Sequence, residues 1–228
     1  MPSSAAQAAR FIDHTLLKPG VCAGAVEKVC AEAIRWKFRT ICIPPCHVSR
    51  AETLLFGSGV SVITVVGFPL GYATSAAKAF EAADAVSNGA KEVDMVLNIC
   101  HLRAGNYGDA ESDVRQVVEA VSGYPVKVIL ETASLSEDEI VIGCRVAQNA
   151  GASYVKTSTG LTGGATVEHV RLMRETVGTR FGIKASGGIR DADMMMQLIQ
   201  AGANRIGTSE SIAIMEEFRG GYTFGEGR

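Results

Sequence analysis

A lysine interrupts the apolar run YVKTSTG at residues 154–160, where a buried strand would carry valine or isoleucine. Lysine is almost never fully buried unless its amine is paired or used in chemistry. A second lysine, Lys184, interrupts the similar run FGIKASG, and Asp94 interrupts EVDMVLN. Taken singly, a strand aspartate is more often a structural hydrogen-bonding group, and a strand lysine more often reaches solvent. Three such residues in similar strands favour a shared function, because burying unpaired charges is costly.

The three residues together could supply an activated amine. A lysine amine is a nucleophile only when it is neutral, and the ordinary pKa of lysine, about 10.4, keeps it protonated at neutral pH. Burial and a second ammonium group nearby both disfavour the protonated form. Lys184 would therefore activate Lys156, or the reverse, while Asp94 would relay protons directly or through a water molecule. The spacing alone leaves open which lysine attacks a carbonyl group.

Small residues follow the last three of the expected strands, where backbone amides could bind an anion. Asp191, shortly after FGIKASG, can cap the next helix. The candidates for binding a phosphate group are Gly160, Gly187, Gly188, Gly207, Thr208 and Ser209. Tight turns also need glycine for purely structural reasons. The two loops after the seventh and eighth strands nevertheless favour a phosphorylated small substrate, whose reactive carbon would reach the lysines.

The elements that position these residues alternate between strands and helices along the whole chain. In three segments a helical pattern runs into a glycine that is expected to end the helix, at Gly89, Gly151 and Gly202, and a β-branched run follows. The eight strands are expected within 11–16, 40–45, 61–68, 126–132 and 181–187, and within the three helix–glycine–strand segments 87–98, 149–160 and 200–211. Near-continuous apolar strands that alternate with helices predict a parallel sheet covered by helices.

Two closures of this sheet compete, a (β/α)8 barrel and a doubly wound open sheet. Eight units in 228 residues are close to the length typical of the barrel. An open sheet that binds a dinucleotide would show GxGxxG after its first strand, and FIDHTL is not followed by that motif. We therefore predict an α/β protein with one (β/α)8 TIM barrel domain over 1–228, a short N-terminal segment at 1–10 and a mobile tail at 219–228.

Composition argues against several other classes of protein. The formal net charge of −2 is spread along the chain, so there is no basic stripe for nucleic acid or a membrane surface. No secretory signal or membrane-spanning run is seen, which predicts a cytoplasmic protein. The six cysteines are scattered and are expected to be reduced, and the four histidines form no metal-binding group. The expected partners are a small molecule or a second copy of the chain.

The blocks YVKTSTG, GIKASGGIR, EVDMVLN, FIDHTLLKP and VILET together resemble the deoxyribose-phosphate aldolase family, over about residues 11–215. Members of that family are class I aldolases, (β/α)8 barrels that need no metal. They reversibly cleave 2-deoxyribose 5-phosphate to acetaldehyde and glyceraldehyde 3-phosphate. The resemblance implies a lyase of deoxyribonucleotide catabolism that uses no cofactor, acts on a small phosphorylated aldehyde sugar and forms a homodimer.

The resemblance also implies roles for individual residues. It identifies Lys156 as the lysine that forms the Schiff base. It gives Lys184 the role of lowering the pKa of that amine and moving protons, and it makes Asp94 an acid and base. Asp13 and Thr15 resemble the family's positions near the substrate and its proton network.

This chain departs from part of the family pattern at Leu161, where some members carry a lysine. Two other functions stay open for the chain as a whole. One is a different Schiff-base aldolase or transaldolase-like barrel that acts on another sugar phosphate. The other is a non-catalytic barrel that binds sugar phosphates, in which Lys156 and Lys184 would contact the phosphate group.

Overall fold

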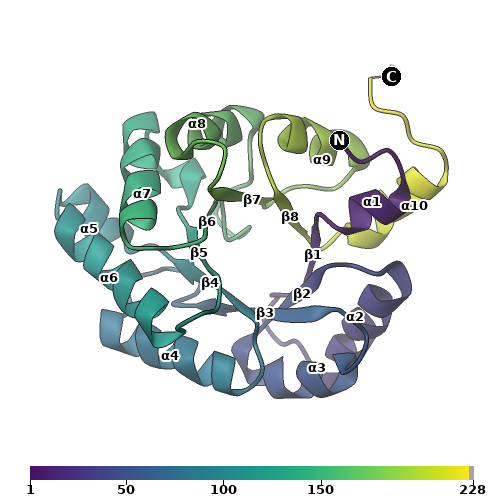
Figure 1. Ribbon diagram of the computed structural model, residues 1–228, viewed down its shortest axis with the longest axis horizontal. Coiled ribbons are helices and arrows are strands. Elements are labelled where there is room, and N and C mark those ends of the chain that lie inside the picture. Colours follow the sequence, from purple (N-terminus) through teal and green to yellow (C-terminus); the bar gives the residue numbers. More distant parts are fainter. Residues whose placement is uncertain (226–228) are drawn as a thin grey trace.

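A computed structural model of the chain describes residues 1–225. Its eight strands form one closed parallel barrel in the order of the sequence (Figure 1). The strands are β1 Ile12–Thr15, β2 Thr40–Ile43, β3 Ser61–Val66, β4 Glu92–Val96, β5 Val126–Ile129, β6 Tyr154–Lys156, β7 Gly182–Ser186 and β8 Arg205–Thr208. Pairing of Ile12 with Ile206 between β1 and β8 closes the barrel. The (β/α)8 prediction is thus confirmed, and the open-sheet alternative is excluded.

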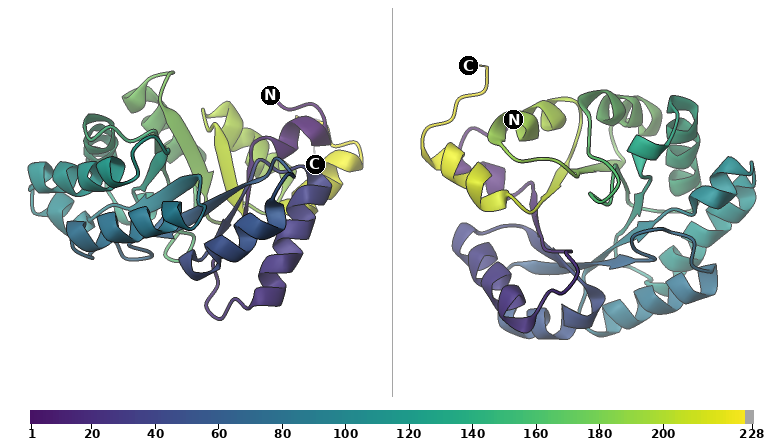
Figure 2. Two further views of the ribbon diagram at one scale, coloured as in Figure 1. Left: turned by 60° about the horizontal axis from the view of Figure 1, so that its bottom comes forward. Right: turned by 180° about the vertical axis from the view of Figure 1, so that it is seen from behind.

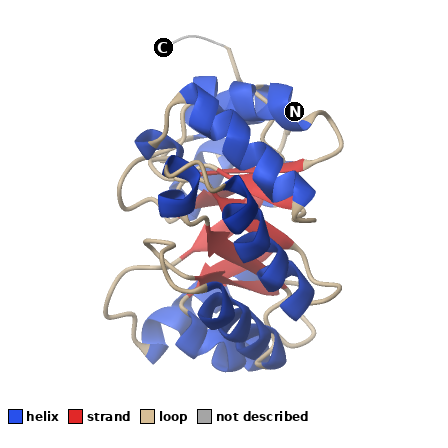
Figure 3. Ribbon diagram, turned by 90° about the vertical axis from the view of Figure 1, so that its left-hand side faces the viewer, coloured by secondary structure: helices blue, strands red, loops and turns tan. Residues whose placement is uncertain are grey.

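Helices form a ring around the barrel (Figures 1 and 2). In the side view, helices lie above and below the strands (Figure 3). The helices are α1 Ala5–Ala9, α2 Ala23–Trp36, α3 Val48–Leu55, α4 Ser75–Ser87, α5 Ile99–Arg103, α6 Tyr107–Ala120, α7 Glu137–Asn149, α8 Val167–Val177, α9 Ala192–Gln200 and α10 Ser211–Arg219. Two short 3₁₀ turns, η1 Pro45–His47 and η2 Thr132–Ser134, follow β2 and β5.

Local sequence signals set the limits of several helices. The glycines predicted to follow α4, α7 and α9 all have positive φ, at 113°, 84° and 120°. Asp191 caps α9 as predicted, since its side chain accepts a hydrogen bond from the amide of Met194. Ser136 and Glu139 form a reciprocal capping box at the start of α7. These caps fix where each helix leaves the sheet.

The two faces of the strands have different compositions. Most strand residues that face the helices are apolar and belong to one large core, among them Ile12, Val93, Val128, Ile183 and Ile206. Alternate residues point into the barrel, and many of those are charged. The apolar packing that holds the fold together therefore lies between the strands and the helices, which leaves the barrel interior available for polar chemistry.

Helices α1 and α10, which are the first and last helices of the described residues, pack beside each other (Figure 1). The N-terminal segment 1–10 contains α1. The predicted tail 219–228 begins at the last residue of α10, and residues 226–228 lie outside the described part of the chain. Within residues 1–225, no helix is both long and apolar enough to cross a bilayer.

Candidate active site

The structure brings together the three residues singled out in the sequence. Lys156 and Lys184 are direct partners in the register of β6 and β7. Both amines donate to the same carboxylate oxygen, Asp94 Oδ2, from 2.9 Å and 2.7 Å respectively. Lys156 is 2% exposed, and the other two side chains are fully buried. Two buried amines therefore meet on one carboxylate oxygen, as the hypothesis of an activated lysine requires.

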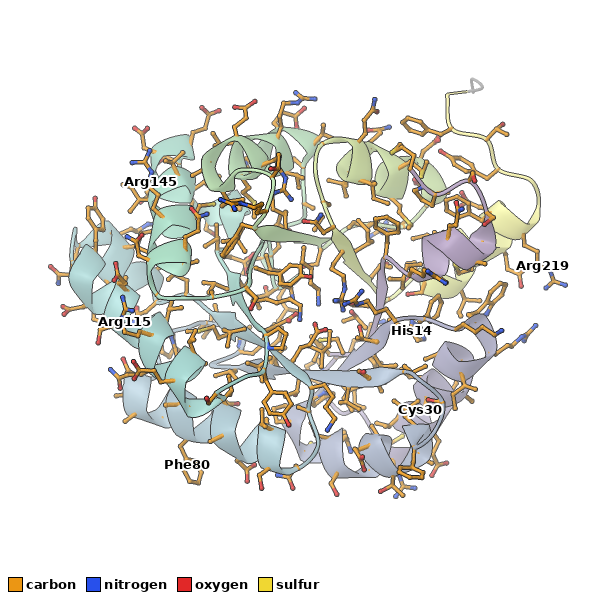
Figure 4. All side chains as sticks on the ribbon, viewed as in Figure 1. His14, Cys30, Phe80, Arg115, Arg145 and Arg219 are labelled. Atoms are coloured by element: carbon orange, nitrogen blue, oxygen red, sulfur yellow. The ribbon has the colours of Figure 1, made fainter. Side chains whose placement is uncertain are left out.

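Asp13 and Thr15, at the end of β1, occupy different positions relative to this group. Lys184 Nζ lies 2.7 Å from Asp13 Oδ2, so Lys184 contacts two carboxylates. The hydroxyl of Thr15 donates to the backbone oxygen of Asp13 at 2.9 Å. His14, between them, points away from the barrel interior and hydrogen-bonds Glu32 of α2 at 2.9 Å (Figure 4). Asp13 therefore belongs to the charged group, while Thr15 lies next to it.

Three further charged residues in the barrel interior complete a closed ring of ion pairs. Lys127 Nζ donates to Asp94 Oδ1 at 3.0 Å and contacts Glu92. Arg205 contacts Glu92 Oε1 at 3.3 Å, and its Nε donates to Asp13 Oδ1 at 2.8 Å. Successive contacts around the ring join Lys184, Asp94, Lys127, Glu92, Arg205 and Asp13. Positive and negative residues alternate without interruption.

The ion pairs of the ring keep Asp94, Asp13 and Lys184 in their charged forms. Burial alone would raise the pKa of Asp94, but Lys127 and the two lysines on Oδ2 outweigh it and hold that pKa well below its usual range. For Asp13, burial is likewise outweighed by Lys184 and Arg205, which lower its pKa to about 2. Burial would lower the pKa of Lys184, but Asp13 and Asp94 raise it above the usual value for lysine. Lys184 is therefore a permanent cation at neutral pH.

Cys42 of β2 lies beside this charged group. Burial raises the pKa of its thiol, and Lys184 and Asp94 act on it with opposite signs. Its side chain packs with Ile63 and Val65, and Leu17 and Phe68 cover that small cluster. Cys42 is therefore a neutral thiol under neutral conditions.

The loops after β6 and β7 pack backbone against backbone. The amide of Ala165 donates to the oxygen of Gly187 at 3.0 Å. A Cβ atom at Gly187, which has φ of 89°, would lie 2.7 Å from the oxygen of Gly163. Gly188 also has positive φ, but a Cβ atom there would have its nearest neighbour at 3.9 Å. Gly187 therefore has a packing reason to be glycine, and Gly160 and Gly188 are less constrained by their neighbours.

The expectation that Gly207 and Thr208 follow the eighth strand is wrong, because both belong to β8. A Cβ atom at Gly207 would lie 2.9 Å from Lys184 Cε and 3.0 Å from Ser186 Cβ, so this glycine makes room for the lysine. The hydroxyl of Thr208 donates to the oxygen of Ile189 at 2.6 Å and accepts from the amide of Glu210 at 2.9 Å. Of the three residues, Ser209 alone is exposed and follows the strand.

A cavity of about 390 Å³ opens at the carboxyl ends of β1, β2 and β3. Leu17 and Phe68, which cover Cys42, also line this cavity, so it lies next to the buried charged group. Lys18 and Leu161 line it as well. The six small residues predicted to bind phosphate are not among its lining residues. The cavity and the predicted phosphate loops are therefore separate regions of the same end of the barrel.

Comparison with protein families identifies the chain. A family model described as "DeoC/LacD family aldolase" matches residues 8–216, which is almost the whole barrel. The chain belongs to this family of aldolases. It is an enzyme of the lyase class, and the family resemblance noted in the sequence is confirmed.

Several proteins similar to this aldolase carry the name deoxyribose-phosphate aldolase. A protein of Thermoanaerobacter pseudethanolicus named deoxyribose-phosphate aldolase is 51% identical over 214 residues, which cover 92% of this chain and 96% of that protein. A crystal structure from Coccidioides immitis has a TM-score of 0.92 and 40% identity over 96% of this chain and 87% of that one. The deoxyribose-phosphate aldolase of Aeropyrum pernix, described as a tetramer, has a TM-score of 0.89 and 31% identity over 96% and 93% of the two chains.

The sequence analysis did not single out Lys127, Glu92 and Arg205 of the ion-pair ring. Like Asp94, each is a charged residue within an otherwise apolar strand. Glu92 shares the strand face of Asp94, and Lys127 and Arg205 interrupt the apolar runs of β5 and β8. Counting charges on all eight strands would have found the three residues. Their pairing depends on the closure of the barrel, which only the three-dimensional arrangement reveals.

Glu131, which the sequence analysis did not single out, holds the loop that follows β6. It follows β5 with a left-handed backbone, φ 60° and ψ 55°, which is unfavourable for a residue other than glycine. Its Oε2 accepts hydrogen bonds from the amide of Thr159 at 3.2 Å and from its hydroxyl at 2.5 Å. Glu131 thereby fixes the loop three residues after Lys156.

Proposed function

We propose that the protein is a deoxyribose-phosphate aldolase, which reversibly cleaves 2-deoxyribose 5-phosphate to acetaldehyde and glyceraldehyde 3-phosphate through a Schiff base on Lys156. The observation that carries this proposal is the pair of buried lysine amines on one oxygen of Asp94. The chain is 51% identical to a protein named deoxyribose-phosphate aldolase, which supports 2-deoxyribose 5-phosphate as the substrate. The family membership supports the reaction type.

The contacts of the two lysines support Lys156 as the nucleophile. Lys184 contacts both Asp13 and Asp94, and they raise its pKa, so it keeps its proton. Lys156 contacts one carboxylate, Asp94, and shares that oxygen with the ammonium of Lys184. Repulsion between the two cations favours loss of the proton from the lysine with fewer carboxylate contacts.

The reaction then follows from the chemistry of a neutral amine. Lys156 attacks C1 of the open-chain sugar, and loss of water gives an iminium ion. Removal of the proton from the C3 hydroxyl breaks the C2–C3 bond, releases glyceraldehyde 3-phosphate and moves the electron pair into the iminium, which becomes an enamine. Protonation at C2 and hydrolysis release acetaldehyde and restore the amine.

In this mechanism Asp94 and Lys184 place a negative and a positive charge beside the reacting amine. Asp94 stays ionised, because its neighbours hold its pKa far below neutrality. Its Oδ2 accepts from both amines, which orients Lys156 and holds the ammonium group of Lys184 beside it. Lys184 supplies the fixed positive charge beside the reacting nitrogen.

The phosphate group is expected at the loops that follow β6, β7 and β8. Gly160 and Gly188 support this assignment, because both have positive φ and neither is constrained by a close backbone neighbour. Ser209 is exposed directly after β8. Gly187, Gly207 and Thr208 stay candidates, although each also has a structural role. The apolar cavity would take the carbon chain of the substrate or of an aldehyde partner.

Trapping the intermediate tests the proposal. The enzyme is incubated with 2-deoxyribose 5-phosphate and borohydride, and the modified peptide is located by mass spectrometry. The expected product is an N-ethyl group on Lys156, with release of glyceraldehyde 3-phosphate, whereas turnover without borohydride should release acetaldehyde as well. Lys156→Arg is the matched control, because it keeps the positive charge and cannot form the adduct. A stable adduct on a different lysine, or substrate binding with no adduct, would contradict the assignment.

The same experiment separates the two alternative functions. Another Schiff-base aldolase would give an adduct at Lys156 with a different sugar phosphate and release a different carbonyl compound, such as dihydroxyacetone. A binding protein would bind inorganic phosphate without forming an adduct. The homodimer and the cytoplasmic location stay predictions, and sedimentation measurements would decide the oligomeric state.

A further inference from the structure

The ion-pair ring in the barrel interior is electrically balanced without Lys156. Three cations alternate with three carboxylates, namely Lys184, Asp94, Lys127, Glu92, Arg205 and Asp13. Each side chain is buried, and the most accessible residue, Glu92, is 8% exposed. Lys156 attaches to this ring through Asp94 as a seventh charged group. If Lys156 is protonated, the buried cluster carries one uncompensated positive charge.

The contacts of the four cations single out Lys156. Lys184, Lys127 and Arg205 each contact two carboxylates of the ring. Across residues 1–225, Lys156 contacts Asp94 alone among the acidic side chains. A buried cation with one shared carboxylate is less well compensated than a cation with two.

We propose that Lys127, Glu92 and Arg205 are positioning residues that set the protonation of Lys156, because they neutralise the rest of the ring and leave this amine as its surplus cation. The inference rests on the proposed function, since it concerns the amine assigned there as the nucleophile. It adds an electrostatic role for three residues deeper in the barrel, beyond the local effect of Lys184.

The other groups around Lys156 do not take up this charge. Asp94 of β4 stays ionised, and Lys184 of β7 stays protonated. Cys42 of β2 is neutral because burial raises the pKa of its thiol. Asp13 of β1 is ionised, with its pKa lowered to about 2. A change in the total charge of the ring should therefore change the proton affinity of the Lys156 amine.

Two substitutions change the ring charge in opposite directions. Lys127→Met leaves the ring with one excess negative charge, which favours protonated Lys156 and should move the pH of half-maximal adduct formation upwards. Glu92→Gln leaves one excess positive charge, which disfavours protonated Lys156 and should move that pH downwards. We expect each shift to be about one pH unit, which corresponds to a tenfold change in proton affinity. The double variant has a neutral ring, so its midpoint should return close to that of the unchanged enzyme.

The experiment measures the rate of borohydride-trapped adduct formation at Lys156 with acetaldehyde, as a function of pH. Lys78→Met is the matched control, since Lys78 is equally buried but pairs with Asp113 between α4 and α6, outside the barrel. It should leave the midpoint unchanged. Urea unfolding checks that every variant is folded. If Lys127→Met does not fold, Glu92→Gln and the charge-balanced double variant still test the direction of the shift.

Midpoints that stay unchanged, or that move in the same direction in the folded single variants, would overturn the inference. Failure of the proposed function gives a different result, because the unchanged enzyme would then form no adduct at Lys156 at any pH. An adduct at Lys156 with a midpoint that ignores the ring charge would leave the aldolase proposal intact and remove the role of the ring.

Discussion

Asp13 should make the stability of the barrel sensitive to acid, and Asp13→Asn tests this. The carboxylate contacts Lys184 and Arg205 and accepts a hydrogen bond from the hydroxyl of Thr40 at 2.6 Å. Asparagine has nearly the same shape and keeps an oxygen for that hydroxyl, but it has no charge to compensate the two cations. The substitution therefore removes mainly the electrostatic contribution of this residue.

The lowered pKa gives the size and sign of the effect. Burial would raise the pKa of Asp13, but Lys184 and Arg205 lower it from 3.8 to about 2. Because the folded protein binds the proton less tightly than the unfolded chain, the stabilisation is fully present above about pH 4 and is lost as the pH falls towards 2. The difference of roughly two pH units corresponds to about 2.5 kcal/mol. Lys184 and Arg205 stay charged across this range, since their pKa values are raised.

Urea unfolding from pH 6 to pH 2 measures the free energy of unfolding of both proteins. At pH 6 we expect Asp13→Asn to be less stable by about 2 kcal/mol or more, and the gap should close as Asp13 becomes protonated. Glu119→Gln is the control, because Glu119 is exposed on α6 and should give a small gap at every pH. A gap for Asp13→Asn that is constant between pH 6 and pH 2 would refute the assigned ion pairs.

Three further substitutions test other parts of the structure. Lys78→Met leaves Asp113 buried without its cation, so urea unfolding should show a loss of about 3–5 kcal/mol, and a loss below about 1 kcal/mol would contradict the buried pair. Gly207→Ala puts a Cβ atom 2.9 Å from Lys184 Cε, so steady-state kinetics should show kcat reduced about tenfold or more, and unchanged kcat would argue against this packing. Glu131→Ala removes the acceptor that holds the loop after β6, so the rate of adduct formation at the Schiff-base lysine should fall although the variant stays folded. Equal adduct rates in a folded variant would exclude the positioning role.

The fold could be predicted from the sequence because local patterns determine it. Apolar strand residues alternate with helical segments, and the glycines after α4, α7 and α9 adopt the positive φ that was predicted. The strand that carries Lys156 and the strand that carries Lys184 were also found from the sequence, because a charge in an apolar run is visible there. Pairing of β6 with β7 then brings the two residues into register, which follows from their similar places in successive units.

The phosphate loops were harder to predict, because a glycine can serve a turn, a close approach or a ligand. Gly207 lies within β8 and accommodates the side chain of Lys184, so the sequence-based assignment to a loop was wrong. The error arose because RIGTSES shows no boundary between strand and loop, and strand ends are set by pairing with neighbours. Glu131 was left without a role for a similar reason, since its partner Thr159 is 28 residues away in the chain.

The ring explains how the barrel can hold so many charges in its interior. An isolated buried ion would destabilise the fold, but here each ring carboxylate contacts at least two cations and each ring cation contacts two carboxylates. The apolar core between strands and helices provides the main stabilisation, so the interior needs only to be electrically balanced. A balanced ring with one further amine attached is a device for keeping that amine neutral. If Lys127→Met and Glu92→Gln shift the reactivity of Lys156 in opposite directions, the charge of the ring, and not the nearest cation alone, controls the nucleophile.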